Sequence, residues 1–239
     1  NEEMSKAQYY DYHTNWSFSP GEVLTFIIPS YYGFGNVKYE GPLSNNQEVE
    51  VNTYFGQMPF VDVAQYMGII VFFLALFGIF TCWKEPFVKY LTILSLIALL
   101  ISFGRTFPVL FDLMFYYFPF FDRFRVPSMI LVLVQFSFPI LAGYGLMKII
   151  SLKNEKEPRS LNLLKYTTYI FSGIFIIGLL ANNGINSWMV ERVNNYASTI
   201  QSSQPQLAQQ FNALADFIGN MFVNDFLIGF GLLSITFIF

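Results

Sequence analysis

The sequence contains few of the residues from which disulfide and metal sites are built. One cysteine, Cys82, and one histidine, His13, occur among 239 residues. A single cysteine excludes an internal disulfide framework, and His13 has no nearby cysteine or second histidine with which to bind zinc. No P-loop, zinc-protease or Cys-x-x-Cys motif is present. We therefore expect no metal site built from these residues and interpret Cys82 as a small apolar residue at a helix end.

Charge is also scarce, and apolar residues take its place. Charged residues make up 12 % of the chain, whereas a soluble domain has about a quarter. Hydrophobic residues make up 54 %, phenylalanine alone accounts for 29 residues, and the mean hydropathy is +0.45. A small water-soluble fold cannot bury that much apolar surface, but a bilayer can. The composition predicts an all-α integral membrane protein, a polytopic helical bundle with extracytoplasmic loops.

Apolar runs suited to crossing a bilayer recur along the chain. A transmembrane helix needs about 20 predominantly apolar residues. Lys84–Pro86, between the first two runs, leaves room only for a tight helical hairpin. We expect a transmembrane bundle over residues 63–239. Its predicted spans are four complete ones, at 63–83, 87–103, 127–147 and 164–181, and a truncated one at 226–239.

Two segments of this region do not fit a simple span. Residues 104–126 are aromatic but charged and interrupted by prolines, which indicates interfacial short helices or a re-entrant segment. Residues 182–222 are polar and are predicted to form an outer loop. An apolar stripe at helical spacing predicts an amphipathic helix within that loop: Leu207, Phe211, Leu214, Ala215 and Ile218.

Residues 1–62 are polar, acidic and rich in turn-forming residues, and we predict an extracytoplasmic loop region there. Basic residues gather in the loops after the first and third spans, which places those loops in the cytoplasm and segments 104–126 and 182–222 outside. The chain is also expected to be an internal piece of a longer protein. It starts at Asn1 rather than Met, and its last apolar stretch is shorter than a complete span.

Arginines at the predicted outer mouth of the bundle are the first candidate site. Arg123 and Arg125 lie just before the third span, and Arg105 closes the second. Arginine suits phosphate because its planar guanidinium donates paired hydrogen bonds and keeps its charge. The alternative interpretation is a structural one, in which these side chains extend to the interface or pair with Asp122.

Glu22 and Tyr54 are candidates for a second binding surface. Glu22 follows a Ser-Pro-Gly turn, and its carboxylate is suited to binding a sugar hydroxyl or accepting a proton. Ser19 and Glu22 also have the spacing of a helix capping box, which is the structural alternative. Tyr54 opens an aromatic stretch before the first span, where rings stack on sugars or simply form the interfacial belt.

Several short motifs, in this order and spacing, resemble the YfhO-type bacterial membrane proteins, which belong with the C-type glycosyltransferases. The resemblance covers about residues 15–147, and from Leu161 onward the sequence is generic for a membrane protein. The motifs are Ser19–Glu22 with Pro29 and Gly33, Tyr54–Phe60, Tyr66–Gly68, Ser102–Arg105, Phe124–Pro127 and Ala142–Gly145.

The resemblance implies a function in the bacterial cell envelope. A C-type glycosyltransferase of the inner (cytoplasmic) membrane transfers a sugar from a polyprenyl-phosphate donor to an extracytoplasmic glycan or protein acceptor. By analogy, Arg125, Arg105 and Arg123 would bind the donor phosphate, and Glu22 and Tyr54 would line the acceptor cleft. The family's catalytic carboxylate has no matching position, so the catalytic residue is unknown and is expected upstream of Asn1.

Two other functions stay open at this stage. The chain fits a transporter or flippase for a lipid-linked glycan, with the same arginines guiding the head group, or a structural membrane subunit. The clustering of charges at a mouth rather than at mid-span favours the transferase. The expected partners are the lipid-linked donor, membrane lipid and the acceptor, with no nucleic acid. No cofactor is certain; a divalent metal ion is the one that the resemblance leaves open.

Overall fold

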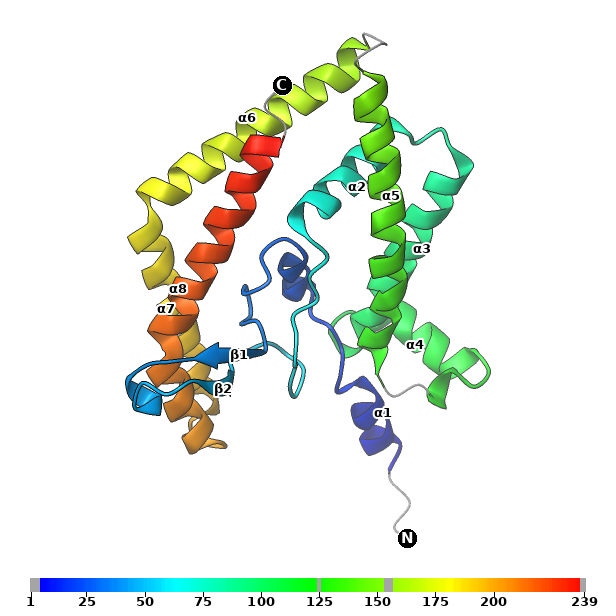
Figure 1. Cartoon of the computed structure of the whole chain (residues 1–239). Coiled ribbons are helices and arrows are strands. Elements are labelled where there is room, and N and C mark those ends of the chain that lie inside the picture. The colour runs from blue at the N-terminus through cyan, green and yellow to red at the C-terminus, as the bar shows by residue number, and fades with distance from the viewer. Residues whose placement is uncertain (1–4, 124–125, 153–156, 237–239) are drawn as a thin grey trace. The chain divides into compact units, whose positions relative to one another are not determined.

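The computed structural model describes residues 5–123, 126–152 and 157–236, which are mostly helical (Figure 1). Three helical stretches among them are long and apolar enough to cross a membrane: Pro127–Ser151, Pro158–Leu180 and Pro205–Thr236. These stretches indicate a membrane-embedded protein. The chain folds into two compact units that alternate along the sequence. The first comprises residues 1–23, 57–59 and 71–155, and the second comprises residues 24–56, 60–70 and 156–239.

The first unit is built on helices α3 (Pro86–Ser102) and α5 (Val132–Ser151), which pack together, and on most of α2 (Ile69–Thr81). Gly78 of α2 and Gly145 of α5 meet at close range: a Cβ atom on Gly145 would lie 2.1 Å from the Leu74 carbonyl oxygen. Small residues are what lets two membrane helices approach so closely. The shorter elements are α1 (Lys6–Thr14), η3 (Gly104–Thr106), α4 (Pro108–Tyr117), η4 (Phe121–Arg123) and η5 (Pro127–Leu131). The first residues of η1 (Pro20–Phe26) also belong to this unit, whose first segment ends at Val23.

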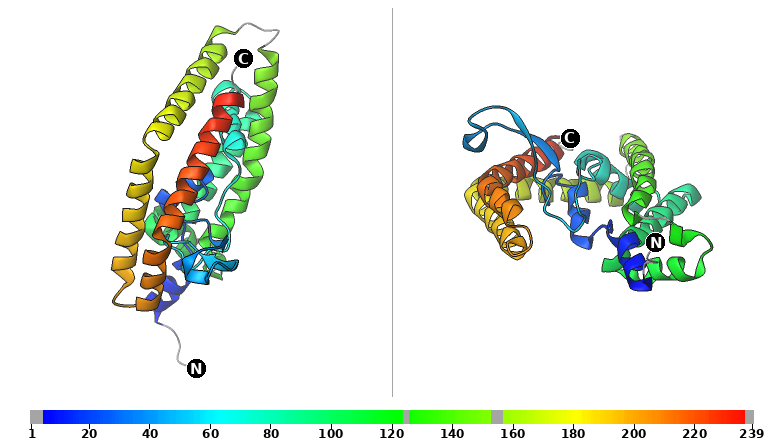
Figure 2. Two further views of the ribbon diagram at one scale, coloured as in Figure 1. Left: turned by 60° about the vertical axis from the view of Figure 1, so that its left-hand side comes forward. Right: turned by 90° about the horizontal axis from the view of Figure 1, so that it is seen from below.

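The second unit contains three helices, α6 (Pro158–Leu180), α7 (Asn182–Ile200) and α8 (Pro205–Thr236). Helices α7 and α8 lie side by side (Figure 2), and α6 packs against α8. The core between them follows the helical period, because the buried residues of α7 recur every fourth position. It comprises Met189, Val193 and Ala197 of α7 with Ala208, Phe211, Leu214, Ala215, Ile218 and Phe222 of α8.

A short β-hairpin joins this core. Strands β1 (Asn36–Tyr39) and β2 (Val49–Asn52) are antiparallel, with Tyr39 opposite Val49 and Val37 opposite Val51; η2 (Pro42–Ser44) lies between them. Alternate residues of a strand face opposite sides. One face of the hairpin is therefore apolar: its Tyr39 belongs to the α7–α8 core, and its partly buried Val51 packs against that core. The other face carries the polar residues, including Lys38, which pairs with Glu48 at 2.6 Å.

The beginning of the first predicted span differs from the expectation. Residues 63–68 are not helical, and α2 starts at Ile69 and is 13 residues long. Gly68 has a φ of +92°, which a right-handed helix excludes. The N–H of Ile69 donates to the Tyr66 hydroxyl at 3.1 Å, so a side chain satisfies the first turn of the helix. Hydropathy detects neither feature, because it measures apolar content alone and Val63–Met67 is apolar enough to belong to a span.

Residues 182–236 form two helices rather than a loop followed by a short span. The predicted amphipathic stripe is present, with Phe211, Leu214, Ala215 and Ile218 buried. However, the helix that carries it continues without a break through the apolar residues to Thr236. The polar faces of α7 and α8 led to the loop prediction. Two polar helices are stable here because each buries one apolar stripe against the other.

Candidate functional site

Four separate stretches of the first unit are tied together around Ser17, and we call this cluster the Ser17 junction. It comprises residues 16–18, Gln57, 102–106 and 127–128. The N–H of Phe18 donates to the Ser102 carbonyl at 2.8 Å, and the N–H of Ser128 donates to the Trp16 carbonyl at 3.3 Å. The amide of Gln57 donates to the Ser17 carbonyl at 3.1 Å and accepts from the Thr106 hydroxyl at 2.7 Å. Three of these stretches overlap motifs that carry the family resemblance, and the fourth, residues 16–18, directly precedes the motif Ser19–Glu22.

Gly104 fits against the Ser17 side chain at the centre of the junction. The Ser17 hydroxyl donates to the Thr14 carbonyl at 2.6 Å and accepts from the N–H of Arg105 at 3.1 Å. A Cβ atom on Gly104 would lie 2.0 Å from the Ser17 Oγ, and the φ of Gly104 is +42°. Both the space and the backbone conformation require glycine. The end of α3 is thereby held in one geometry, from which the Arg105 side chain points outward as an exposed residue.

The arginines differ in how the structure places them. Arg105 and Arg123 are exposed, and within the described residues neither guanidinium forms an ion pair or a side-chain hydrogen bond. Arg123 lies over the Phe120 ring, 5.1 Å from its centroid. Arg125, the strongest candidate from the sequence, lies outside the described residues. Of the three predicted phosphate ligands, Arg105 is the one whose backbone is fixed by the Ser17 junction.

The two acceptor candidates are buried. Glu22 is 1 % exposed; its carboxylate accepts from the N–H of Ser19 at 2.7 Å, and its own N–H donates to the Ser19 hydroxyl at 3.3 Å. This reciprocal pair confirms the capping box that the spacing predicted. Tyr54 belongs to the second unit and is 8 % exposed. Neither side chain offers an open surface, so their role in binding an acceptor stays a prediction from the resemblance.

Helix α1 is attached to α4 by a partly buried hydrogen bond. The Tyr10 hydroxyl donates to Asp112 Oδ1 at 2.6 Å, and the Tyr10 ring lies among the rings of Phe111, Phe115 and Tyr116. Burial, reinforced by this hydrogen bond, raises the pKa of Tyr10 above its ordinary value of 10. The neutral phenol is therefore the form that the fold stabilises.

We expect this contact to make stability fall at alkaline pH. The contribution is fully present below pH 10, where Tyr10 is neutral both folded and unfolded, and it is lost as the pH rises above 10 and the unfolded chain releases the proton first. Thermal unfolding of Tyr10→Phe should show a weaker decline of Tm over this range. Tyr12→Phe, on the exposed side of the same helix, should keep the wild-type profile. Identical profiles for all three proteins would contradict the assignment.

Sequence reasoning missed Arg192, which the structure places among four aromatic rings of the second unit. Its guanidinium carbon lies 4.2 Å and 4.3 Å from the ring centroids of Tyr31 and Tyr32, 5.3 Å from that of Phe55 and 5.6 Å from that of Trp188. Nη1 also donates to the Tyr31 carbonyl at 2.8 Å. We call this the Arg192 cluster. It attaches the segment 24–56 to α7 through cation–π contacts and a charged hydrogen bond.

The described residues contain no group of three or more His, Cys, Asp or Glu side chains close enough to hold a metal ion. Fold and site together define a mostly helical protein with three helical stretches long and apolar enough to cross a membrane, and with a junction that presents an exposed arginine after the end of α3. Comparison with known proteins adds nothing more specific, because no family model, curated protein or solved structure matches the chain.

Proposed function

We propose that the chain is part of a bacterial inner-membrane glycosyltransferase, the part that binds the phosphate of a polyprenyl-phosphate sugar donor. The sugar goes to an extracytoplasmic glycan or protein acceptor. The observation that carries the proposal is the Ser17 junction. It joins the segments that resemble the C-type family, and it fixes the backbone of Arg105, whose guanidinium is exposed.

The chemistry of the transfer fits such an arginine. The donor's phosphate becomes the leaving group, so negative charge increases on its oxygens as the glycosidic bond breaks. A guanidinium held beside those oxygens stabilises that charge most in the transition state. A rigid backbone helps because less side-chain and loop entropy is lost when the arginine engages the phosphate. Arg123, stacked on Phe120, and Arg125 are the further phosphate ligands in this proposal.

Replacing Arg105 tests the proposal in the full-length protein, reconstituted in vesicles with a polyprenyl-phosphate sugar and an acceptor. Loss of a charged hydrogen bond costs about 1.5–3 kcal/mol, so kcat/KM of Arg105→Ala should fall roughly 10- to 100-fold. Arg105→Lys should recover only part of this loss, because lysine lacks the planar fork. Arg159→Ala removes an exposed arginine of α6, on the side predicted to be cytoplasmic, and should leave the rate unchanged.

Two results would overturn the proposal. If Arg105→Ala transfers sugar at the wild-type rate, Arg105 has no role in the reaction. A wild-type protein that moves the donor between leaflets without modifying any acceptor would instead be a flippase.

A further inference from the structure

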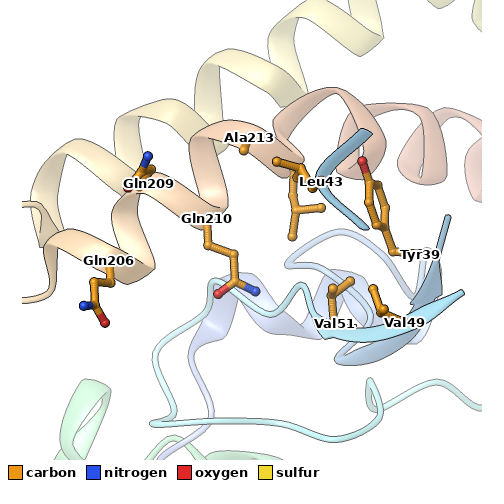
Figure 3. A pocket seen from close by; sticks show the side chains of 9 residues that line it. Tyr39, Leu43, Val49, Val51, Gln206, Gln209, Gln210 and Ala213 are labelled. Atoms are coloured by element: carbon orange, nitrogen blue, oxygen red, sulfur yellow. The ribbon is translucent and has the colours of Figure 1, made fainter. Parts of the chain in front are cut away.

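A pocket of about 390 Å³ opens in the second unit between the β-hairpin and the first turns of α8 (Figure 3). Tyr39, Val49 and Val51 of the hairpin form one wall together with Leu43, and α8 contributes the opposite wall with Ala213 and Leu214. Gln206, Gln209 and Gln210 complete the lining. Its volume is in the range of small-molecule sites.

The polar groups of the pocket are all uncharged. The three glutamines are exposed, recur at helical spacing on α8, and form no side-chain hydrogen bond within the part of the chain that the structure describes. In Figure 3 the Gln210 amide extends towards Val51 across the pocket. Each amide offers both a donor and an acceptor. The Tyr39 hydroxyl, likewise without a hydrogen bond to described residues, adds one more group of both kinds.

The charged residues of the hairpin lie on its other face. Lys38 and Glu50 are opposite each other in the register and alternate with the pocket-lining Tyr39, Val49 and Val51. The pocket therefore presents aliphatic and aromatic carbon next to amides, with no charge to select an ion. A lipid tail has no donor or acceptor to offer the amides, which disfavours it as the occupant. A saccharide matches both parts, because its hydroxyls donate and accept while its C–H faces pack on apolar walls.

We propose that this pocket binds a neutral saccharide unit of the glycan that the protein acts on. The saccharide's hydroxyls bond to the glutamine amides, and one sugar face rests against Tyr39 and the valines of β2. Its place in the reaction rests on the proposed function, whereas binding itself does not depend on Arg105 or on transfer.

Saccharide binding is measured directly on the full chain in detergent, by saturation-transfer NMR and titration with maltose, cellobiose and N,N′-diacetylchitobiose. At least one disaccharide should bind the wild type. Ala213→Trp fills the pocket from an exposed helix position and should weaken binding at least about 10-fold. Gln210→Ala removes hydrogen bonds without adding bulk and should weaken it about 5- to 10-fold. Asn212→Trp, exposed on the same helix but outside the pocket, is the matched control and should bind as the wild type does.

The proposal is overturned if none of the three disaccharides binds the wild type. It is also overturned if Ala213→Trp and Gln210→Ala bind as tightly as Asn212→Trp. Binding of an apolar hexapeptide in place of any saccharide would make the pocket a peptide groove. The outcome is separable from the proposed function, because Arg105→Ala should lose transfer and keep disaccharide binding.

Discussion

Gly104→Ala is expected to unfold the first unit at a markedly lower temperature. The added methyl group would overlap the Ser17 Oγ, and its residue would hold a left-handed φ of +42°. The conformation costs about 1–2 kcal/mol and the overlap about 1–3 kcal/mol. A total of about 3 kcal/mol corresponds to a fall in Tm of about 6–12 °C for a chain of this size. Labelling of Cys82, the single cysteine and a half-buried one, reports the transition with a thiol-reactive dye.

The two causes can be separated with a second substitution. Ser17→Gly removes the side chain that the new methyl group would meet, and with it the two hydrogen bonds of the Ser17 hydroxyl. Measured against Ser17→Gly alone, the added Gly104→Ala should therefore cost only the conformational part of the loss. Gly143→Ala is the matched control, because a methyl group there meets nothing within 4 Å, and its Tm should change little. Equal effects of Gly104→Ala and Gly143→Ala would disprove the role of the junction.

Arg192→Ala is expected to release the segment 24–56 from α7. It removes four cation–π contacts and the hydrogen bond to the Tyr31 carbonyl, which together contribute about 3 kcal/mol. Limited proteolysis and hydrogen exchange of this segment measure the effect, and both rates should rise by a factor of about 100 where exchange follows local opening. The core of α7 and α8 should stay protected.

Two further variants sharpen this test. Arg192→Lys keeps the charge but loses the planar face that stacks on Tyr31 and Tyr32, so it should recover less than half of the protection. Glu191→Ala changes the exposed neighbouring residue and should exchange as the wild type does. If Arg192→Ala also exchanges at the wild-type rate, the cluster is not what holds the segment.

The helical fold and the presence of helices apolar and long enough to cross a membrane could be predicted, because hydropathy is summed over long stretches. The apolar stripe from Phe211 to Ile218 could also be predicted, because its helical spacing is complete within a short stretch of sequence. The start of α2 was not, because it depends on Gly68 and on the Tyr66 hydroxyl rather than on apolar content. The length of α8 was also missed, because a polar helix that buries one stripe against a partner resembles a loop in composition.

Among the candidate site residues, local contacts could be predicted from the sequence and contacts between distant segments could not. The Ser19–Glu22 capping box is local and was predicted from spacing alone. The contact between Ser17 and Gly104 joins residues distant in sequence, and no periodic pattern reports it. Arg192 did leave a signal, because Trp188 precedes it by one helical turn, but its other aromatic partners come from the segment 24–56. A single arginine in a polar stretch is usually a solvated one, and only tertiary packing distinguishes it.

Helix α8 has a mechanical consequence. Its 32 residues extend over about 48 Å, whereas the hydrocarbon core of a bilayer is about 30 Å thick. The amide-lined end and the apolar end are thus parts of one stiff rod with no joint between them. A helix of this length that crosses the hydrocarbon core extends about 18 Å beyond it. A tilt of about 10° around the point where the helix leaves the core would move its far end by about 3 Å. In the membrane arrangement that we propose, bilayer thickness, through the tilt that it imposes on α8, is therefore expected to shift the proposed saccharide pocket without any ligand.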